Sequence, residues 1–159
     1  MGTTGISVNN VWDNKILVVA IIANFIAQGL KPFIHYLAYH TWDWRLMFST
    51  GGFPSSHSAA VTALTTLVGV DQGVGSPLFA ICVIFASLVF YDASGVRQEV
   101  GKHARTLNAV FDEFKLWDRF DYRKFTELVG HSRFEVIGGI LTGLLVALLS
   151  LQIPFLKPR

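Results

Sequence analysis

Cysteine and charge are both scarce in this sequence of 159 residues. The single cysteine, Cys82, lies within an apolar run, which excludes a framework of disulfide bonds within one chain. Charged residues make up 15% of the chain, whereas soluble domains usually carry about a quarter. The formal net charge of +2 is too small to indicate a nucleic-acid partner.

The missing charges divide the chain into apolar and polar stretches. Charged residues crowd into 92–133 and are almost absent from four stretches, 16–30, 54–70, 72–91 and 136–156. This partition is typical of a polytopic membrane protein. We therefore predict an all-α fold, a membrane helix bundle of about four to five transmembrane helices with a charged amphipathic loop. One domain, 1–159, accounts for the chain, with a flexible segment at 1–10.

The first apolar run is short for a bilayer, which requires about 20 residues. Residues 1–14 lack the basic flank and the cleavage site of a secretory signal, so we expect the run to be retained. Asn24 and Gln28 are four residues apart, and we expect their shared helix face to contact protein. The Lys31-Pro32 pair indicates a kink or a helix boundary. A fifth helix or a re-entrant element at 32–48 is an alternative.

The later runs are separated by recognisable turns. The second run, 58–70, is rich in Ala, Thr and Ser and is expected to pack closely against other helices. The third run is expected to end at 92–97. Residues 98–130 have apolar residues at helical spacing, which predicts an amphipathic segment at the membrane surface or folded over the site. The alternative is a solvated connecting helix. Asp121 could cap a short helix that leads to Gly130. In the last run, Gly139 and Gly143 form a close-packing pair.

Basic residues predict the orientation. Four crossings place most of them on one side, and the positive-inside rule assigns that side to the cytoplasm. The crowded side holds Lys31, Arg45, Arg97, Lys102, Arg105, Lys115, Arg119, Arg123, Lys124 and Arg133, and the opposite side holds Lys15, Lys157 and Arg159.

Two histidines stand at helix starts on the crowded side. His57 follows the stretch 51–56 (GGFPSS). This stretch can bind phosphate, because the free N–H groups at the start of a helix attract anions. The alternative is that Ser55 or Ser56 serves only as an N-cap. His131 is followed four residues later by Glu135, whose carboxylate can hold one imidazole nitrogen and leave the other nucleophilic. The stretch 132–135 (SRFE) is also a capping box, and the two roles are compatible.

Three basic residues on the same side, Lys31, Arg45 and Arg97, can hold a phosphate together, although each alone is an ordinary interface base. A metal site of His57, His131 and Glu135 fits by residue type. No tight ligand spacing such as H-E-x-x-H is present, so we predict no metal and no required cofactor.

The chain contains three motifs in this order: GGFPSSHSAA at 51–60, YDASGVR at 91–97 and GHxxxEV at 130–136. Together they resemble the divergent branch of the type 2 phosphatidic acid phosphatase family. This family is related to the vanadium-dependent haloperoxidases. The resemblance covers roughly 15–155. It implies that His131 attacks phosphorus, that Glu135 orients it, and that His57 protonates the leaving oxygen. Lys31, Arg45, Ser55, Ser56 and Arg97 are then the phosphate-binding residues.

The sequence departs from the wider family in three places. Ser56 stands where the family's P-S-G-H motif has glycine, and Glu135 stands for aspartate. Lys124 and Phe125 occupy the positions of an S-R pair that should precede His131. The K-x6-R-P motif is broken, because Arg45 lies fourteen residues after Lys31 and no proline follows it.

These patterns predict an integral, multi-pass membrane phosphatase whose active-site face is cytoplasmic. It acts on a lipid phosphate or lipid pyrophosphate through a phosphohistidine, and homo-oligomers are compatible with the sequence. The alternative is a non-catalytic protein that binds anionic lipid heads and a partner through 92–130. A transporter or flippase is less favoured, because the polar residues gather at one face and not at mid-membrane.

Overall fold

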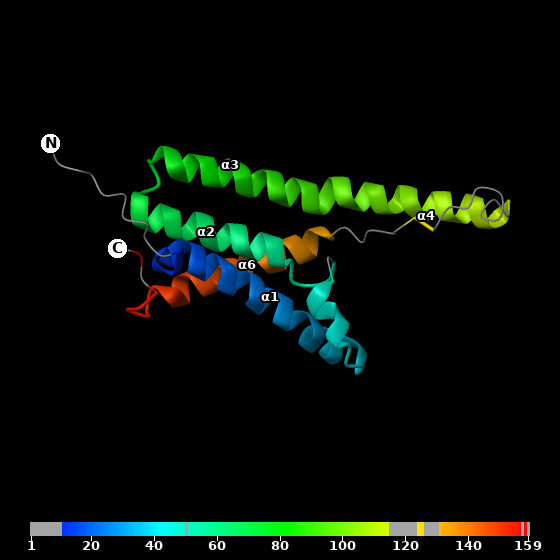
Figure 1. Cartoon of the computed structure of the whole chain (residues 1–159), viewed down its shortest axis with the longest axis horizontal. Coiled ribbons are helices and arrows are strands. Elements are labelled where there is room, and N and C mark those ends of the chain that lie inside the picture. The colour runs from blue at the N-terminus through cyan, green and yellow to red at the C-terminus, as the bar shows by residue number, and fades with distance from the viewer. Residues whose placement is uncertain (1–10, 50, 115–123, 126–130, 157, 159) are drawn as a thin grey trace.

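The computed structural model describes residues 11–49, 51–114, 124–125, 131–156 and 158, and these residues form helices and turns without a strand. Four helices form a bundle and a fifth extends from it (Figure 1). Their bounds are α1 Lys15–Tyr39, α2 Ser56–Gln72, α3 Pro77–Tyr91, α4 Arg97–Glu113 and α6 Arg133–Ser150. The predicted all-α membrane bundle is confirmed.

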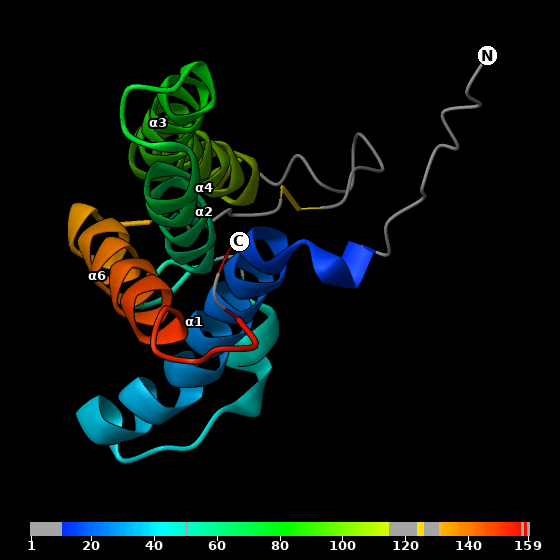
Figure 2. The ribbon, with the colours of Figure 1, turned by 90° about the vertical axis from the view of Figure 1, so that its left-hand side faces the viewer.

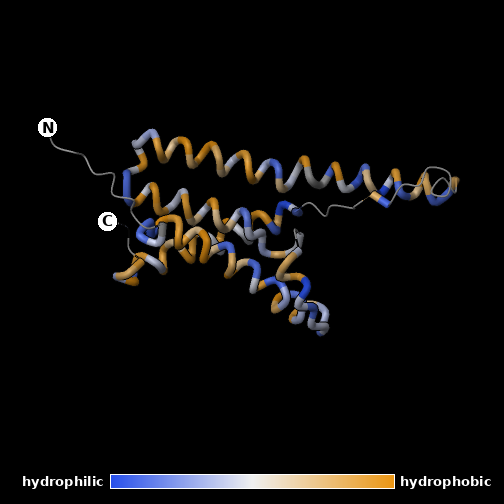
Figure 3. Tube along the Cα trace, viewed as in Figure 1, coloured by the Kyte–Doolittle hydropathy of each residue, from blue (hydrophilic) through white to orange (hydrophobic). Residues whose placement is uncertain are grey.

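Three helical segments are long and apolar enough to cross a membrane: Lys15–Tyr39, Pro77–Glu113 and Arg133–Ser150. Apolar residues dominate the bundle, whereas polar residues are frequent along α4 (Figure 3). The 17 residues of α2 rise about 25 Å and lie among the other bundled helices.

Helix α2 is the centre of the bundle and packs against α1, α3 and α6 (Figure 2). The fully buried core consists mainly of alanines, which let the helix backbones approach closely. Its members are Val19, Ala23, Ala27, Ala59, Ala63, Leu67 and Ala147.

The predicted glycine pair of the last helix is part of this packing. A Cβ atom added to Gly143 would overlap the carbonyl oxygen of Ala59, and one added to Gly139 would overlap the carbonyl oxygen of Ser55. The α6 backbone therefore lies directly against the α2 backbone, which confirms the expected close-packing face.

The chain brings four helix ends together. The ends of α1 and α3 and the starts of α2 and α6 lie at one end of the bundle, whereas the start of α1 and the end of α6 lie at the other (Figure 1). Because His57 is in the first turn of α2 and His131 immediately precedes α6, both histidines belong to the same end.

Helix α1 continues beyond the predicted boundary. Pro32 lies inside α1, which ends only at Tyr39. Of the two alternatives predicted at Lys31-Pro32, the helix boundary is wrong, because a buried proline is tolerated in a transmembrane helix, where neighbouring groups compensate for the missing N–H. The kink stays a prediction. The short 3₁₀ helix η2, Trp44–Phe48, follows and packs on α1. Residues 32–39 belong to α1, so a separate fifth helix at 32–48 is wrong, whereas the alternative of a re-entrant element stays a prediction.

Helix α3 ends at Tyr91, next to the predicted end at 92–97, but the chain stays helical there. A π-helical turn, η3 (Asp92–Val96), joins it to α4, so that one helical segment runs from Pro77 to Glu113. Helix α4 is amphipathic, as expected, but it extends away from the bundle in line with α3 and is not folded over the helix starts (Figure 1). Asp121, the predicted cap, lies outside the described residues.

Candidate functional site

The start of α6 combines a capping box with a histidine–carboxylate pair. The Glu135 N–H donates to Ser132 Oγ at 3.3 Å, and the Ser132 N–H donates to Glu135 Oε2 at 2.8 Å. The same Oε2 atom lies 3.1 Å from His131 Nδ1. Both interpretations of this stretch are thus present at once, because one carboxylate oxygen caps the helix and holds the imidazole.

The His131 side chain is buried, with 1% of its surface exposed. Its second ring nitrogen, Nε2, is buried and has no hydrogen-bond partner within the described part of the chain. Buried polar atoms are nearly always hydrogen-bonded, and an exception often marks a functional group or an absent ligand. When Nδ1 donates to Glu135, Nε2 carries the lone pair of the ring.

The start of α2 is fastened to the same helix end. The Ser55 N–H donates to the backbone carbonyl oxygen of Glu135 at 2.9 Å. Ser55 is the N-cap of α2, and its Oγ accepts from the N–H and the hydroxyl of Ser58, at 3.4 and 3.0 Å. The carbonyl oxygen of Ser56 accepts from Asn24 Nδ2 at 3.4 Å, so Asn24 faces protein. The backbone N–H of Ser55 is therefore engaged within the protein.

Lys31 and Glu135 line one cavity of about 320 Å³, which we call the Lys31 cavity. Only 3% of the Lys31 surface is exposed, and its Nζ donates to the carbonyl oxygen of Ser49 at 2.9 Å. The opposite charges of Lys31 and Glu135 attract each other across this cavity. Its other walls are largely apolar or aromatic, formed by Ile34, His35, Ala38, Tyr39, Leu46, Gly52 and Phe53.

His57 lines a second cavity of about 260 Å³, the His57 cavity, together with Leu88, Val89, Asp92 and Ala93. The carbonyl oxygen of Ala93, in the π-helical turn, accepts from the His131 N–H at 2.9 Å. The backbone of His131 is therefore hydrogen-bonded to Ala93, which lines the His57 cavity. Its ring lies within hydrogen-bond distance of Glu135, which lines the Lys31 cavity.

The remaining predicted cations are placed differently. Arg45 is exposed on η2, where its N–H donates to Asp43 Oδ1 at 3.0 Å, and it is not among the lining residues of either cavity. Arg97 begins α4, and its side chain lies outside the described part of the structure. Lys124 forms an ion pair with Asp112 of α4 at 2.9 Å, away from both helix starts.

Sequence reasoning missed two residues that line the cavities, His35 and Asp92. His35 lies four residues after Lys31 and hence on the same face of α1, but placing a helix boundary at Pro32 hid this relation. Asp92 was taken as the end of α3, and only the π-helical turn reveals it beside His57. The described residues contain no group of three or more His, Cys, Asp or Glu side chains arranged to hold a metal ion.

Comparison with known proteins decides the family. The sequence model of the Divergent PAP2 family matches residues 12–146. The chain belongs to this family. The matched range includes His57, His131 and Glu135 and excludes only the two ends of the chain, so the resemblance inferred from the three motifs is confirmed.

One relative of this Divergent PAP2 protein is an uncharacterized membrane protein, YuiD, from Bacillus subtilis (strain 168). The two sequences are 40% identical over 143 residues, which cover 83% of this chain and 90% of YuiD. No solved structure matches the chain. Membership in the family and the membrane-protein relative agree with the three candidate membrane spans.

Proposed function

We propose that this protein is an integral membrane phosphatase that hydrolyses a lipid phosphate or a lipid pyrophosphate through a phosphohistidine. The observation that carries the proposal is the state of the His131 ring. Its Nδ1 is 3.1 Å from Glu135 Oε2, whereas its Nε2 is buried without a partner among the described residues. A carboxylate that holds one nitrogen of an imidazole orients the other for attack.

In the proposed reaction, His131 Nε2 attacks the phosphorus atom and the bond from phosphorus to the leaving oxygen breaks. His57 donates a proton to that oxygen. Water then attacks the phosphohistidine with His57 as the base, which releases inorganic phosphate and restores both histidines. Since Nε2 is covered in the chain without substrate, the surroundings of His131 have to open for the phosphate group to reach it.

Phosphate binding is assigned first to Lys31. Its ammonium group is buried in a cavity that Glu135, the partner of the His131 ring, also lines. We assign Arg45, Arg97, Ser55 and Ser56 to the same phosphate by resemblance to the family. The N–H of Ser55 would have to leave the carbonyl oxygen of Glu135 to take part.

A lipid substrate suits the surroundings of Lys31. The cavity is lined by apolar and aromatic residues apart from Lys31, His35 and Glu135, and it lies at the end of a bundle of membrane helices. An amphiphile with an anionic head can place its head at Lys31 while its chains stay in the bilayer. The active-site face is proposed to be cytoplasmic, on the positive-inside argument.

The test is phosphate release by the purified protein from a lipid phosphomonoester and from a lipid diphosphate. His57→Ala should lower the rate at least about a hundredfold, the usual contribution of an acid–base group. His131→Ala should lower it at least as much, because it removes the nucleophile. His40→Asn is the matched control, because His40 is exposed with a φ of 56°, which asparagine tolerates. An acid-labile, base-stable phosphorylated intermediate should form in the wild type and not in His131→Ala. Wild-type rates in both alanine variants would refute the mechanism.

A second candidate is a non-catalytic protein that binds anionic lipid heads, with a partner bound through 92–130. The burial of His131 and the engagement of Ser55 within the protein favour it. In that case the wild type binds vesicles containing anionic lipid in a Lys31-dependent way, and neither lipid class is hydrolysed.

A further inference from the structure

Helix α4 carries an apolar stripe that the described part of the chain leaves uncovered. The stripe, which we call the α4 seam, consists of Val96, Val100, His103, Leu107, Val110 and Phe114. Its five apolar side chains are 41–68% exposed. Beyond the bilayer, such a row of side chains in water favours an interaction surface.

The spacing of the α4 seam is that of a coiled coil. Successive members are alternately four and three residues apart. This is the seven-residue repeat of a coiled coil, which keeps one face turned toward a partner helix. In a heptad, Val100, Leu107 and Phe114 occupy a positions, whereas Val96, His103 and Val110 occupy d positions. His103 is the only polar member.

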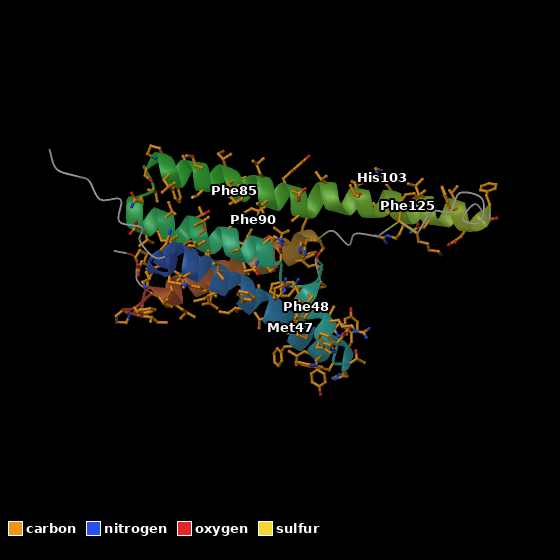
Figure 4. All side chains as sticks on the ribbon, in the orientation of Figure 1. Met47, Phe48, Phe85, Phe90, His103 and Phe125 are labelled. Carbon is orange, nitrogen blue, oxygen red and sulfur yellow. The ribbon has the colours of Figure 1, made fainter. Side chains whose placement is uncertain are left out.

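The protein's own chain already occupies another side of α4. The Asn108 side chain donates to the carbonyl oxygen of Phe125 at 3.0 Å and accepts from its N–H at 2.9 Å. The rings of Phe111 and Phe125 pack edge to face at 5.8 Å. In Figure 4, Phe125 and His103 lie on opposite sides of α4. The returning segment, where it is described, thus leaves the seam open.

The direction of α4 decides between a bilayer and a protein as the partner. Because α4 continues α3 through η3, the seam runs away from the membrane bundle along the line of a candidate membrane span (Figure 1). Every copy in one membrane holds α4 with the same polarity and at the same height. Two copies therefore present the same a and d layers to each other, side by side and in register.

We propose that the α4 seam pairs with the seam of a second copy of this chain, as a short parallel coiled coil. The seam spans 19 residues from Val96 to Phe114, or about 27 Å. A helix pair this short is marginal in solution, but anchoring both helices in one membrane raises their effective concentration. Glu99 and Lys102, the charged pair beside the seam, neutralise each other within one helix at 2.7 Å.

The test is cross-linking in membranes, with the single cysteine removed as Cys82→Ala. Val110→Cys places a thiol in the seam, and Ala109→Cys places one on the exposed side away from it. Mild oxidation should give a covalent dimer about tenfold faster at Val110→Cys than at Ala109→Cys. Equal rates at the two positions would overturn the proposal.

Two further substitutions address the seam itself. Leu107→Asp should lower the affinity of dimerisation at least about tenfold, whereas Ala109→Asp should leave it unchanged. His103→Leu should raise it, because it completes the apolar seam. Dimer mass is measured in detergent and in lipid nanodiscs, together with the unfolding temperature of the monomer. A wild type that stays monomeric in both media overturns the proposal. A lower unfolding temperature of the Leu107→Asp monomer also overturns the proposal, because it means that the seam is covered by the chain's own residues in the monomer.

Discussion

The N–H of Ser55 donates to the backbone carbonyl oxygen of Glu135 at 2.9 Å and so joins the start of α2 to the start of α6. The Glu135 side chain meanwhile accepts from the Ser132 N–H and holds His131. The backbone of Glu135 thus joins two helices, whereas its side chain caps α6 and holds the candidate nucleophile His131. Substitutions of the side chain can separate these roles, because the junction does not depend on it.

The contact between α2 and α6 predicts that Gly143→Ala is destabilising. The new Cβ would overlap the carbonyl oxygen of Ala59, a backbone atom that cannot move alone. Overpacking of this kind costs about 1–3 kcal/mol, more than the helix propensity that alanine gains. Thermal unfolding in detergent should show a fall in the unfolding temperature.

Two other glycines provide controls for this prediction. Gly29→Ala meets no atom within 4 Å and should be neutral or slightly stabilising. For Gly138→Ala the three nearest atoms all belong to the ring of Phe53, which is 43% exposed and can turn aside, so this change should cost less than Gly143→Ala. Equal effects at all three positions would show that backbone contact does not govern the packing of α6.

Lys31 and Glu135 are predicted to be coupled in stability. Lys31→Met keeps the length of the side chain but removes the donor to Ser49 and the positive charge in the cavity with Glu135. Each single change, Lys31→Met or Glu135→Gln, should lower the free energy of unfolding. The double variant should lower it by less than the sum of the two single losses. Coupling between neighbouring groups is about 0.5–3 kcal/mol.

The matched control for this cycle is the exposed ion pair of Lys102 and Glu99, whose side chains are 55% and 56% exposed. The cycle of Lys102→Met and Glu99→Gln should give a coupling of at most about 0.5 kcal/mol, as for surface pairs. Unfolding temperatures of the six variants provide the measurement. Equal couplings in the two cycles would contradict a direct interaction across the Lys31 cavity.

Asn108→Ala should loosen the returning segment from α4. The substitution removes both hydrogen bonds to the backbone of Phe125, each of which contributes about 0.5–1.5 kcal/mol. The fraction of molecules in which the segment around Phe125 is detached from α4 should rise about tenfold or more. Trypsin should therefore cleave after Lys124 correspondingly faster. Thr106→Ala, an exposed change on the same helix, should leave the cleavage rate unchanged.

Much of the fold followed from charge and small residues. The absence of charge located the four bundled helices, and Gly139 and Gly143 marked the face that α6 presents to α2, because in a membrane only small residues permit such close contact. Likewise the four-residue spacing of His131 and Glu135 predicted a contact that depends only on one turn of helix.

Two junctions were not predictable from the local pattern. Pro32 and the stretch Asp92–Val96 both resemble helix ends, yet α1 and the α3–α4 segment continue through them. Local propensity indicates a break, whereas tertiary packing and the low polarity of a membrane favour continuous hydrogen bonding. The two cavities beside His131 depend on these junctions, so His35 and Asp92 became visible only in three dimensions.

The last prediction separates the capping role of Glu135 from its role toward His131. Glutamine is accepted at the third position of a capping box, so Glu135→Gln should keep the cap of α6 and lose only the charge interactions of the carboxylate. Glu135→Ala should lose the cap as well and unfold at a lower temperature than Glu135→Gln. The amide no longer supplies a negative charge to His131 Nδ1, from which Glu135 Oε2 is 3.1 Å away. If His131 is the nucleophile, phosphate release should fall about 10²–10⁴-fold in Glu135→Gln, and the pH dependence of the residual rate should change. A full rate in Glu135→Gln together with a low one in Glu135→Ala would mean that the carboxylate acts only as a helix cap.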